Sequence, residues 1–121
     1  MASSDFQQNK VNFDLSVTIA VGQTVSNAVD LYGTALVGLI TDANLTGTAL
    51  TFQGSDSLTG TYKPIKVLST GSAISSTVMT SSYYTLGTTI DLSSVRFLKV
   101  VSGTIQATNP AVITLATKST N

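Results

Sequence analysis

Apolar and polar residues alternate most clearly near the start of the chain. The apolar residues stand at odd positions, namely Phe13, Leu15, Val17, Ile19 and Val21, and the even positions from 12 to 18 are polar. Successive side chains of a β-strand point to opposite faces of its sheet, whereas a helix would repeat its apolar positions every three or four residues. The alternation therefore predicts a strand with one face in the protein core.

Further strands are expected at short intervals along the chain. The apolar run at 35–41 predicts a central strand buried on both faces, and 48–53 alternates with Leu50 and Phe52 inward. Segment 61–68 contains Pro64, which has no backbone N–H for a neighbouring strand, so this strand is expected at a sheet edge or a bulge. The remaining expected strands are 82–86, 95–101 and 111–117, with shorter ones near 29–32 and 74–79.

Turn-forming residues separate these segments, and no segment has helical periodicity with a capping residue at its start. Short strands at such spacing predict an all-β fold, an antiparallel two-sheet sandwich with the jelly roll as the favoured arrangement. One member of the adjacent pair at 97–98 must face the outside of its sheet. The residues expected in or near the core are Phe13, Leu15, Val17, Ile19, Leu50, Phe52, Phe97, Leu98, Ile113 and Leu115.

The length of 121 residues fits one domain, which we place at residues 11–121. Residues 1–10 are mostly polar and precede the first alternating strand, so they are interpreted as an N-terminal arm. We expect this arm to dock on a neighbouring subunit or on a larger shell, with Phe6 as its anchor. The alternative is that the arm folds back on its own domain as an edge strand.

Charge is scarce in this chain. Six basic and six acidic residues give zero net charge, and charged residues make up 10% of the sequence, against roughly 25% in ordinary globular domains. Neutrality argues against a nucleic-acid partner and against an electrostatic membrane anchor. The start of the chain lacks the basic and apolar segments of a signal peptide, and no apolar run reaches the ~20 residues of a spanning helix.

The residue types that carry most enzyme chemistry are missing. The sequence has no His, no Cys and no Glu, and its six Asp residues are scattered. Serine-hydrolase, Ser-x-x-Lys and phosphate-loop motifs are absent too. We therefore expect no enzyme activity, no cofactor and no metal site. Asp42 and Asn44 have the spacing of a calcium loop, but the closing Glu is absent, so a turn is the favoured interpretation.

The tyrosines are the candidate contact residues. Tyr83 and Tyr84 are adjacent in an expected strand, so one should face the core while the other is available to stack on a sugar or a protein. Tyr62, beside the loop 55–60, allows the same two interpretations. The residues expected to contact a partner are Phe6, Gln7, Gln8, Lys10, Tyr62, Tyr83 and Tyr84.

Several segments, taken in order, resemble a family of small structural proteins of tailed bacteriophages, the capsid decoration (cement) proteins. They are Gly-Gln-Thr-Val at 22–25, Val-Asp-Leu at 29–31, Leu-Thr-Phe-Gln-Gly-Ser at 50–55, Gly-Thr-Tyr-x-Pro-Ile at 60–65, Arg-Phe-Leu-Lys-Val-Val-Ser-Gly at 96–103 and Val-Ile-Thr-Leu at 112–115. The resemblance spans residues 13–117. The acidic or aromatic middle section common in the family is replaced here by the Ser/Thr-rich stretch 69–82.

The resemblance implies a protein on the outer capsid surface of a virion, with the major capsid protein and copies of itself as partners, commonly in a homotrimer. It supplies no catalytic residue. The first alternative is a carbohydrate-binding or receptor-binding module, against which the absence of Trp and the presence of only four Tyr weigh. The second alternative is a head–tail or tail structural subunit, which the sequence does not separate from a decoration protein.

Overall fold

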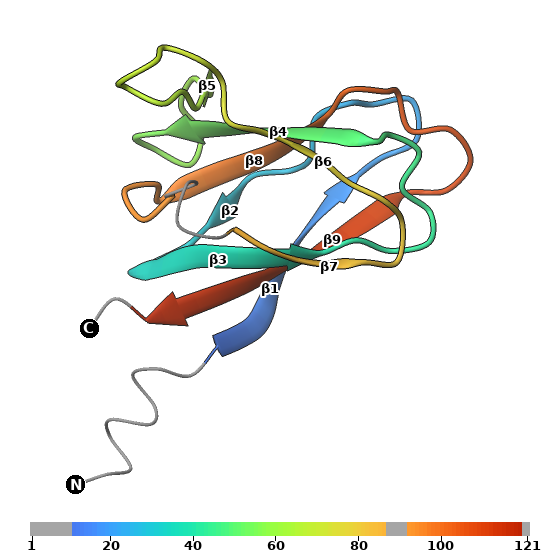
Figure 1. Ribbon diagram of the computed structural model, residues 1–121, viewed down its shortest axis with the longest axis horizontal. Helices are drawn as coiled ribbons and strands as arrows, with labels where there is room; N and C mark the ends of the chain where they lie inside the picture. The colour runs from blue at the N-terminus through green and yellow to red at the C-terminus, as the bar shows by residue number, and fades with distance from the viewer. Residues whose placement is uncertain (1–10, 87–91, 120–121) are drawn as a thin grey trace, which may run out of the picture.

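The computed structural model describes residues 11–86 and 92–119, which form two antiparallel β-sheets facing each other (Figure 1). The first sheet has the order β1-β9-β3-β7, with β1 at Val11–Ile19, β9 at Ala111–Ser119, β3 at Thr34–Ile40 and β7 at Tyr83–Thr85. The second sheet has the order β2-β8-β4-β5, with β2 at Val29–Asp30, β8 at Phe97–Ser102, β4 at Ala49–Ser55 and β5 at Lys63–Pro64. Strand β6, Ser75–Thr77, also pairs with β4. The expected all-β fold with two antiparallel sheets is confirmed.

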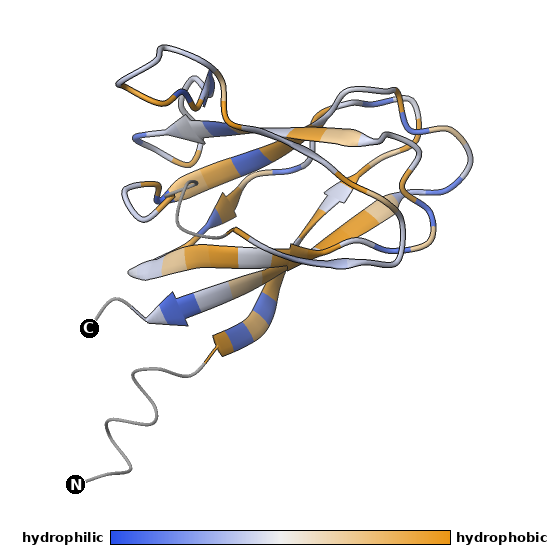
Figure 2. Ribbon diagram, viewed as in Figure 1, coloured by the Kyte–Doolittle hydropathy of each residue, from blue (hydrophilic) through white to orange (hydrophobic). Residues whose placement is uncertain are grey.

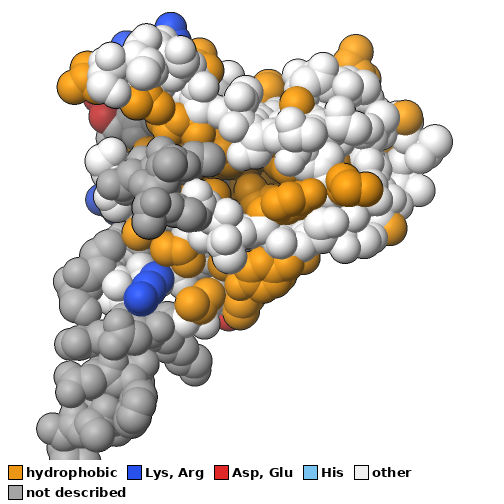
Figure 3. Space-filling view, in the orientation of Figure 1, with side chains coloured by type: hydrophobic (Ala, Val, Ile, Leu, Met, Phe, Trp, Pro, Cys, Tyr) orange, Lys and Arg blue, Asp and Glu red, His pale blue; other side chains and the backbone are white. Residues whose placement is uncertain are grey.

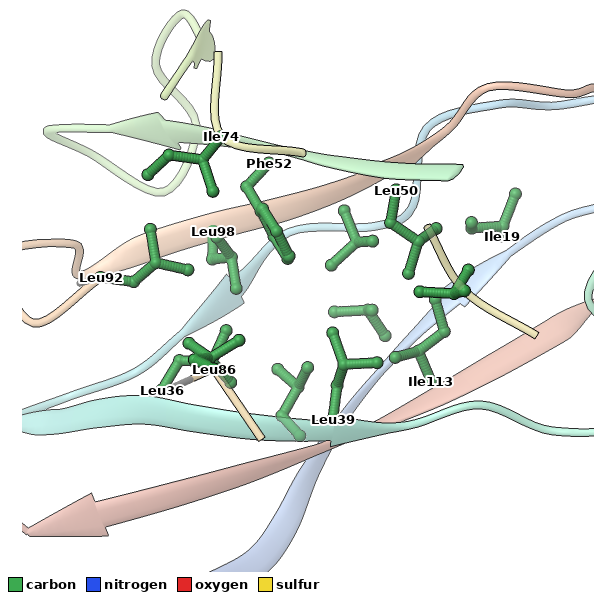
Figure 4. Packing of buried hydrophobic residues seen from close by; sticks show 14 of the residues in the cluster. Ile19, Leu36, Leu39, Leu50, Phe52, Ile74, Leu86, Leu92, Leu98 and Ile113 are labelled. Atoms are coloured by element: carbon green, nitrogen blue, oxygen red, sulfur yellow. The ribbon is translucent and has the colours of Figure 1, made fainter. Parts of the chain in front are cut away.

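The core fills the space between the sheets (Figure 4). Hydrophobic residues concentrate on the strands that flank it, whereas the connecting loops are mostly polar (Figure 2). Of the residues expected there, Val17, Ile19, Leu50, Phe52, Leu98, Ile113 and Leu115 are buried, and Leu15 packs against them. Phe97 is half-buried on the outer side of β8, next to the inward Leu98. Each fully buried large side chain contributes roughly 1.5–3 kcal/mol of hydrophobic stabilisation.

Phe13 does not lie in the core, contrary to the sequence prediction. It is 46% exposed, because β1 contains an irregularity between Asn12 and Leu15. Asn12 pairs with Thr117 and Leu15 with Leu115, so β1 uses one more residue than β9 over this stretch. An extra residue of this kind shifts the alternation of faces by one position. Phe13 is thereby turned to the outer face of the first sheet.

The first strand also ends earlier than its alternation suggested. Val21, the last apolar residue of the pattern, is 47% exposed because it lies in a turn after Ile19. Within that turn Gln23 N donates to Ala20 O at 3.0 Å, and Gly22 has a φ of +82°, which a residue with a Cβ rarely adopts.

The outer edge of β4 carries one interrupted strand. Pro64 of β5 pairs with Gln53, and after a loop Ser75–Thr77 of β6 continues along the same edge to Ala49. A bridge between Lys66 and Ala73 closes the loop, and Ile74 N donates to Ile65 O at 2.9 Å. The expected edge position of Pro64 is confirmed, but the continuous strand expected at 61–68 is wrong, since β5 is limited to Lys63–Pro64.

Candidate functional site

Two aromatic rings meet on the outer face of the first sheet. The ring centroids of Phe13 on β1 and Tyr83 on β7 are 6.1 Å apart, with the ring planes at 81°. These strands are the two edges of the sheet, so the rings lie over the central strands between them. There Gly38 pairs with Ala116, and a Cβ on Gly38 would lie 3.6 Å from the Tyr83 ring. The small central residues leave room for the ring pair.

Other apolar side chains surround this pair. We use the name outer-face patch for Val11, Phe13, Ile40, Tyr83 and Val112, which share that face by strand pairing or, for Phe13, by its ring contact with Tyr83. Figure 3 shows hydrophobic side chains gathered along the lower side of the described body, beside β1, β3 and β7. The only charged residues on the four strands of this sheet are Asp14 and Lys118. The outer-face patch is therefore an apolar area on a nearly uncharged sheet.

The two adjacent tyrosines occupy opposite faces, as the sequence predicted. Tyr83 is 54% exposed, whereas Tyr84 is partly buried against the core. The Tyr84 hydroxyl accepts a hydrogen bond from Met79 N at 2.8 Å. Tyr84 therefore has a structural role in the described chain, and Tyr83 is the member of the pair that a partner can reach.

Tyr62 lies on the other side of the molecule, by the outer face of the second sheet. Its hydroxyl donates to Leu58 O at 2.8 Å, and the Lys99 ammonium lies 4.5 Å from its ring centroid. Burial and the negative charge of Asp30 raise the pKa of Tyr62. The structure thus does not bring Tyr62 together with Tyr83. The expected contact residues Phe6, Gln7, Gln8 and Lys10 lie outside the described residues.

A second group of interacting side chains surrounds Arg96, just before β8. Arg96 Nε lies 3.1 Å from Asp30 Oδ1 and Nη2 lies 3.3 Å from Oδ2, so the ion pair is two-pronged. The guanidinium carbon also lies 5.2 Å from the ring centroid of Tyr32 and 4.9 Å from that of Phe97. We call Asp30, Tyr32, Arg96 and Phe97 the Arg96 cluster. The hydrogen bond from Arg96 lowers the pKa of Asp30, and the same contact raises the pKa of Arg96.

Tyr32 is the most exposed ring of this cluster, at 75%, and its backbone φ is +45°. This conformation is unfavourable for a bulky residue. It is held in place by Asp30 Oδ1, which accepts a hydrogen bond from Tyr32 N at 2.9 Å. A hollow of about 400 Å³ adjoins the ring and is lined by Tyr32, Gly33, Thr34, Arg96 and Ser119. No sequence pattern had indicated this cluster, because Asp30 and Arg96 are 66 residues apart.

Asp42 has a structural role, in agreement with the turn interpretation. Its Oδ1 accepts from Asn44 N at 3.0 Å, and its Oδ2 accepts from Val112 N at 2.8 Å. The carboxylate therefore ties the turn after β3 to the start of β9. Within residues 11–86 and 92–119, no three residues of the types His, Cys, Asp or Glu come together as a metal site would require.

The described segments contain no helix long and apolar enough to cross a membrane. Comparison of the chain with protein-family models, with curated proteins and with solved structures finds no match.

Proposed function

We propose that this chain is a non-enzymatic structural protein of a bacteriophage virion, a capsid decoration (cement) protein on the outer surface of the head. The observation that carries the proposal is the outer-face patch, with Phe13 46% and Tyr83 54% exposed on a nearly uncharged sheet. Scattered exposed apolar residues are ordinary, but aromatic residues grouped on one face are typical of protein contact surfaces. Rings already packed against each other also lose little freedom on binding.

We further propose that the sandwich is a jelly roll. The support is the strand order, in which β1, β9, β3 and β7 form one sheet and β2, β8 and β4 form the other. If β5 and β6 are counted as one interrupted edge strand, each sheet has four positions, and the chain crosses between the sheets at every step except the one from β4 to that edge strand. Jelly rolls of eight strands occur in viral capsid and lectin domains. Fold alone does not assign a function, so this agreement is secondary to the outer-face patch.

The proposed partners are the major capsid protein and further copies of this chain, arranged as a homotrimer. A contact surface with so few charges would depend on apolar burial, so its affinity should change little with salt. Residues 1–10 precede Val11 and Phe13 of the patch in the sequence. In this proposal the N-terminal arm extends the contact to a neighbouring subunit or to the shell, with Phe6 as an additional anchor.

Co-sedimentation tests the proposal, using heads assembled from the major capsid protein of the same genome. The wild-type chain is expected to pellet with the heads at low and at high salt. The double variant Phe13→Ser with Tyr83→Ser should remain in the supernatant while keeping its β-sheet circular dichroism spectrum. Tyr32→Ser is the matched control, because it removes an exposed ring away from the outer-face patch. Wild-type protein that stays in the supernatant, or a double variant that still pellets, would overturn the proposal.

A deletion of residues 1–10 tests the arm separately. If the arm docks on a partner, the shortened chain keeps its melting temperature and loses assembly. If the shortened chain melts earlier and still assembles, the arm belongs to its own domain and the docking hypothesis is wrong.

A further inference from the structure

We infer that the Arg96 cluster and the hollow beside it form a binding site for a neutral saccharide. This inference goes beyond the proposed function and does not use the outer-face patch. Phe97 and Asp30 belong to β8 and β2 of the second sheet, and the hollow also takes Thr34 and Ser119 from the ends of β3 and β9, but none of these residues belongs to the outer-face patch. A subunit attached through the outer-face patch would still present the Arg96 cluster to the surroundings.

The Tyr32 ring is exposed and held in one orientation. Its ring is 75% exposed, and its φ of +45°, together with the φ of +76° at Gly33, belongs to the tight turn that Thr34 N closes by donating to Leu31 O at 3.1 Å. Asp30 holds that conformation by accepting the Tyr32 N–H. The turn and this hydrogen bond together fix the point at which the Tyr32 side chain leaves the backbone. An exposed aromatic face held in one orientation is the surface on which the apolar side of a sugar ring stacks.

The polar side chains of Asp30 and Arg96 lie beside the Tyr32 ring. A sugar presents neighbouring hydroxyl groups that both donate and accept hydrogen bonds. Arg96 supplies donors and Asp30 supplies acceptors, and their two-pronged contact holds both in one plane. Two of the five guanidinium N–H groups point to Asp30, and within residues 11–86 and 92–119 the other three are left for a ligand. The rings of Tyr32 and Phe97 fix the guanidinium in position.

The charge balance of the cluster favours a neutral ligand over an acidic one. Arg96 is already paired with Asp30, so the site has no unpaired positive charge among these residues. An anionic sugar would have to displace the Asp30 carboxylate or lie against it. A neutral sugar can form hydrogen bonds with both Asp30 and Arg96 without breaking the contact between them.

The hollow provides space of a suitable size. Its volume of about 400 Å³ lies within the roughly 300–1,000 Å³ of small-molecule sites. A second hollow of about 180 Å³ adjoins it and is lined by Gly33, Thr34, Ser93, Ser94, Val95 and Arg96. Thr34 and Arg96 line both hollows, so a chain of more than one sugar unit can run from one hollow to the other.

Isothermal titration with a panel of neutral hexasaccharides, built from glucose, mannose, galactose or N-acetylglucosamine, tests the inference, with heparin as the anionic comparison. The decisive variant is Tyr32→Asn, because Asn tolerates a positive φ while lacking the ring. We expect the wild type and Tyr32→Phe to bind at least one neutral hexasaccharide, and Tyr32→Asn to bind it about tenfold more weakly or not at all. The melting temperature of Tyr32→Asn should equal or exceed that of the wild type. Tyr83→Ser is the matched control and should bind as the wild type does.

Three results would overturn the inference: no neutral hexasaccharide binds the wild type, Tyr32→Asn binds as tightly as the wild type, or heparin binds in preference to every neutral sugar. The same variants in the co-sedimentation experiment separate this inference from the proposed function. Tyr32→Asn should still pellet with heads, whereas the double variant at Phe13 and Tyr83 should not.

Discussion

Phe13 and Tyr83 form an edge-to-face pair, with centroids 6.1 Å apart, although they stand on the two edge strands of the first sheet. Two local features make this contact possible. The irregularity in β1 turns Phe13 outward, and Gly38 in the middle of the sheet leaves the space that a side chain would fill. The ring pair is thus a product of backbone irregularity and a small central residue together.

Gly38→Ala should destabilise the protein by about 1–3 kcal/mol. A Cβ at this position would lie 2.7 Å from the carbonyl oxygen of Tyr84, so the backbones of β3 and β7 would have to separate. Urea unfolding measures the effect. Gly103→Ala is the matched control, since its Cβ would meet no atom closer than 3.7 Å and its free energy of unfolding should change by less than about 0.5 kcal/mol. Equal effects of the two substitutions would contradict the close approach at Gly38.

Phe52→Ala and Phe13→Ala should differ strongly in their cost. Phe52 is 1% exposed in the centre of the core, so its truncation should lower the free energy of unfolding by about 3–5 kcal/mol. Phe13 is 46% exposed, so the same truncation should cost about 1 kcal/mol or less. Urea unfolding of both variants in parallel tests this, and a comparable loss in the two would place Phe13 in the core after all.

These two phenylalanines show how far alternation predicts the fold. The pattern around Phe52 follows a regular strand, and its inward direction could be predicted from the sequence alone. At Phe13 the same pattern failed, because an irregularity in strand pairing depends on the partner strand β9, about a hundred residues away in sequence. Leu31, Leu45 and Leu92 are buried as well, but they lie outside the strands and belong to no periodic pattern.

The candidate sites were harder to predict than the core. The alternation of Tyr83 and Tyr84 correctly indicated one exposed ring. By contrast, the Arg96 cluster joins the end of β2 and the turn after it to the start of β8 and the residue before it, and the pairing of Asp30 with Phe97 brings these segments together. Long-range pairing of this kind leaves no local signal in a single sequence.

The pair of Asp30 and Arg96 should make the stability depend on pH in the acid range. The pKa of Asp30 in the folded protein lies below its ordinary value of 3.8, chiefly because Arg96 donates a hydrogen bond to it. A carboxylate with a lowered folded-state pKa stabilises the protein above the unfolded-state pKa and loses this contribution as the pH falls through the folded-state value. The wild type should therefore lose more stability than Asp30→Asn when the pH is lowered through and below about 4. Melting temperatures of both proteins across this range provide the measurement, and parallel pH profiles would exclude a contribution from the pair.

A buried amide joins three loops at the opposite end of the sandwich from the Arg96 cluster. Gln106 is 1% exposed, and its Oε1 accepts from Thr46 N at 3.0 Å. Its Nε2 donates to the carbonyl oxygens of Asn44 and, at 2.7 Å, of Asn109. The backbone of Gln106 also exchanges hydrogen bonds with the turn after β1, through Gly22 N and Gln23 O. All polar atoms of this side chain are therefore satisfied inside the protein.

Gln106→Glu should be among the most damaging single substitutions, although it hardly changes the size of the side chain. It removes both amide donors and directs a buried carboxylate at the carbonyl oxygens of Asn44 and Asn109, which should cost about 3 kcal/mol or more at neutral pH. Burial and the facing carbonyls would raise the folded-state pKa of the new carboxyl above its unfolded-state value. Its protonated form is then favoured in the folded protein, so part of the lost stability returns as the pH falls from neutral towards about 4.5.

Gln106→Met, which cannot titrate, is the control and should cost about 1–3 kcal/mol both at neutral pH and at about pH 4.5. Urea unfolding of the two variants at both pH values measures these costs. If Gln106→Glu is as stable as Gln106→Met at neutral pH, or if its stability does not depend on pH, the amide does not hold the three loops together.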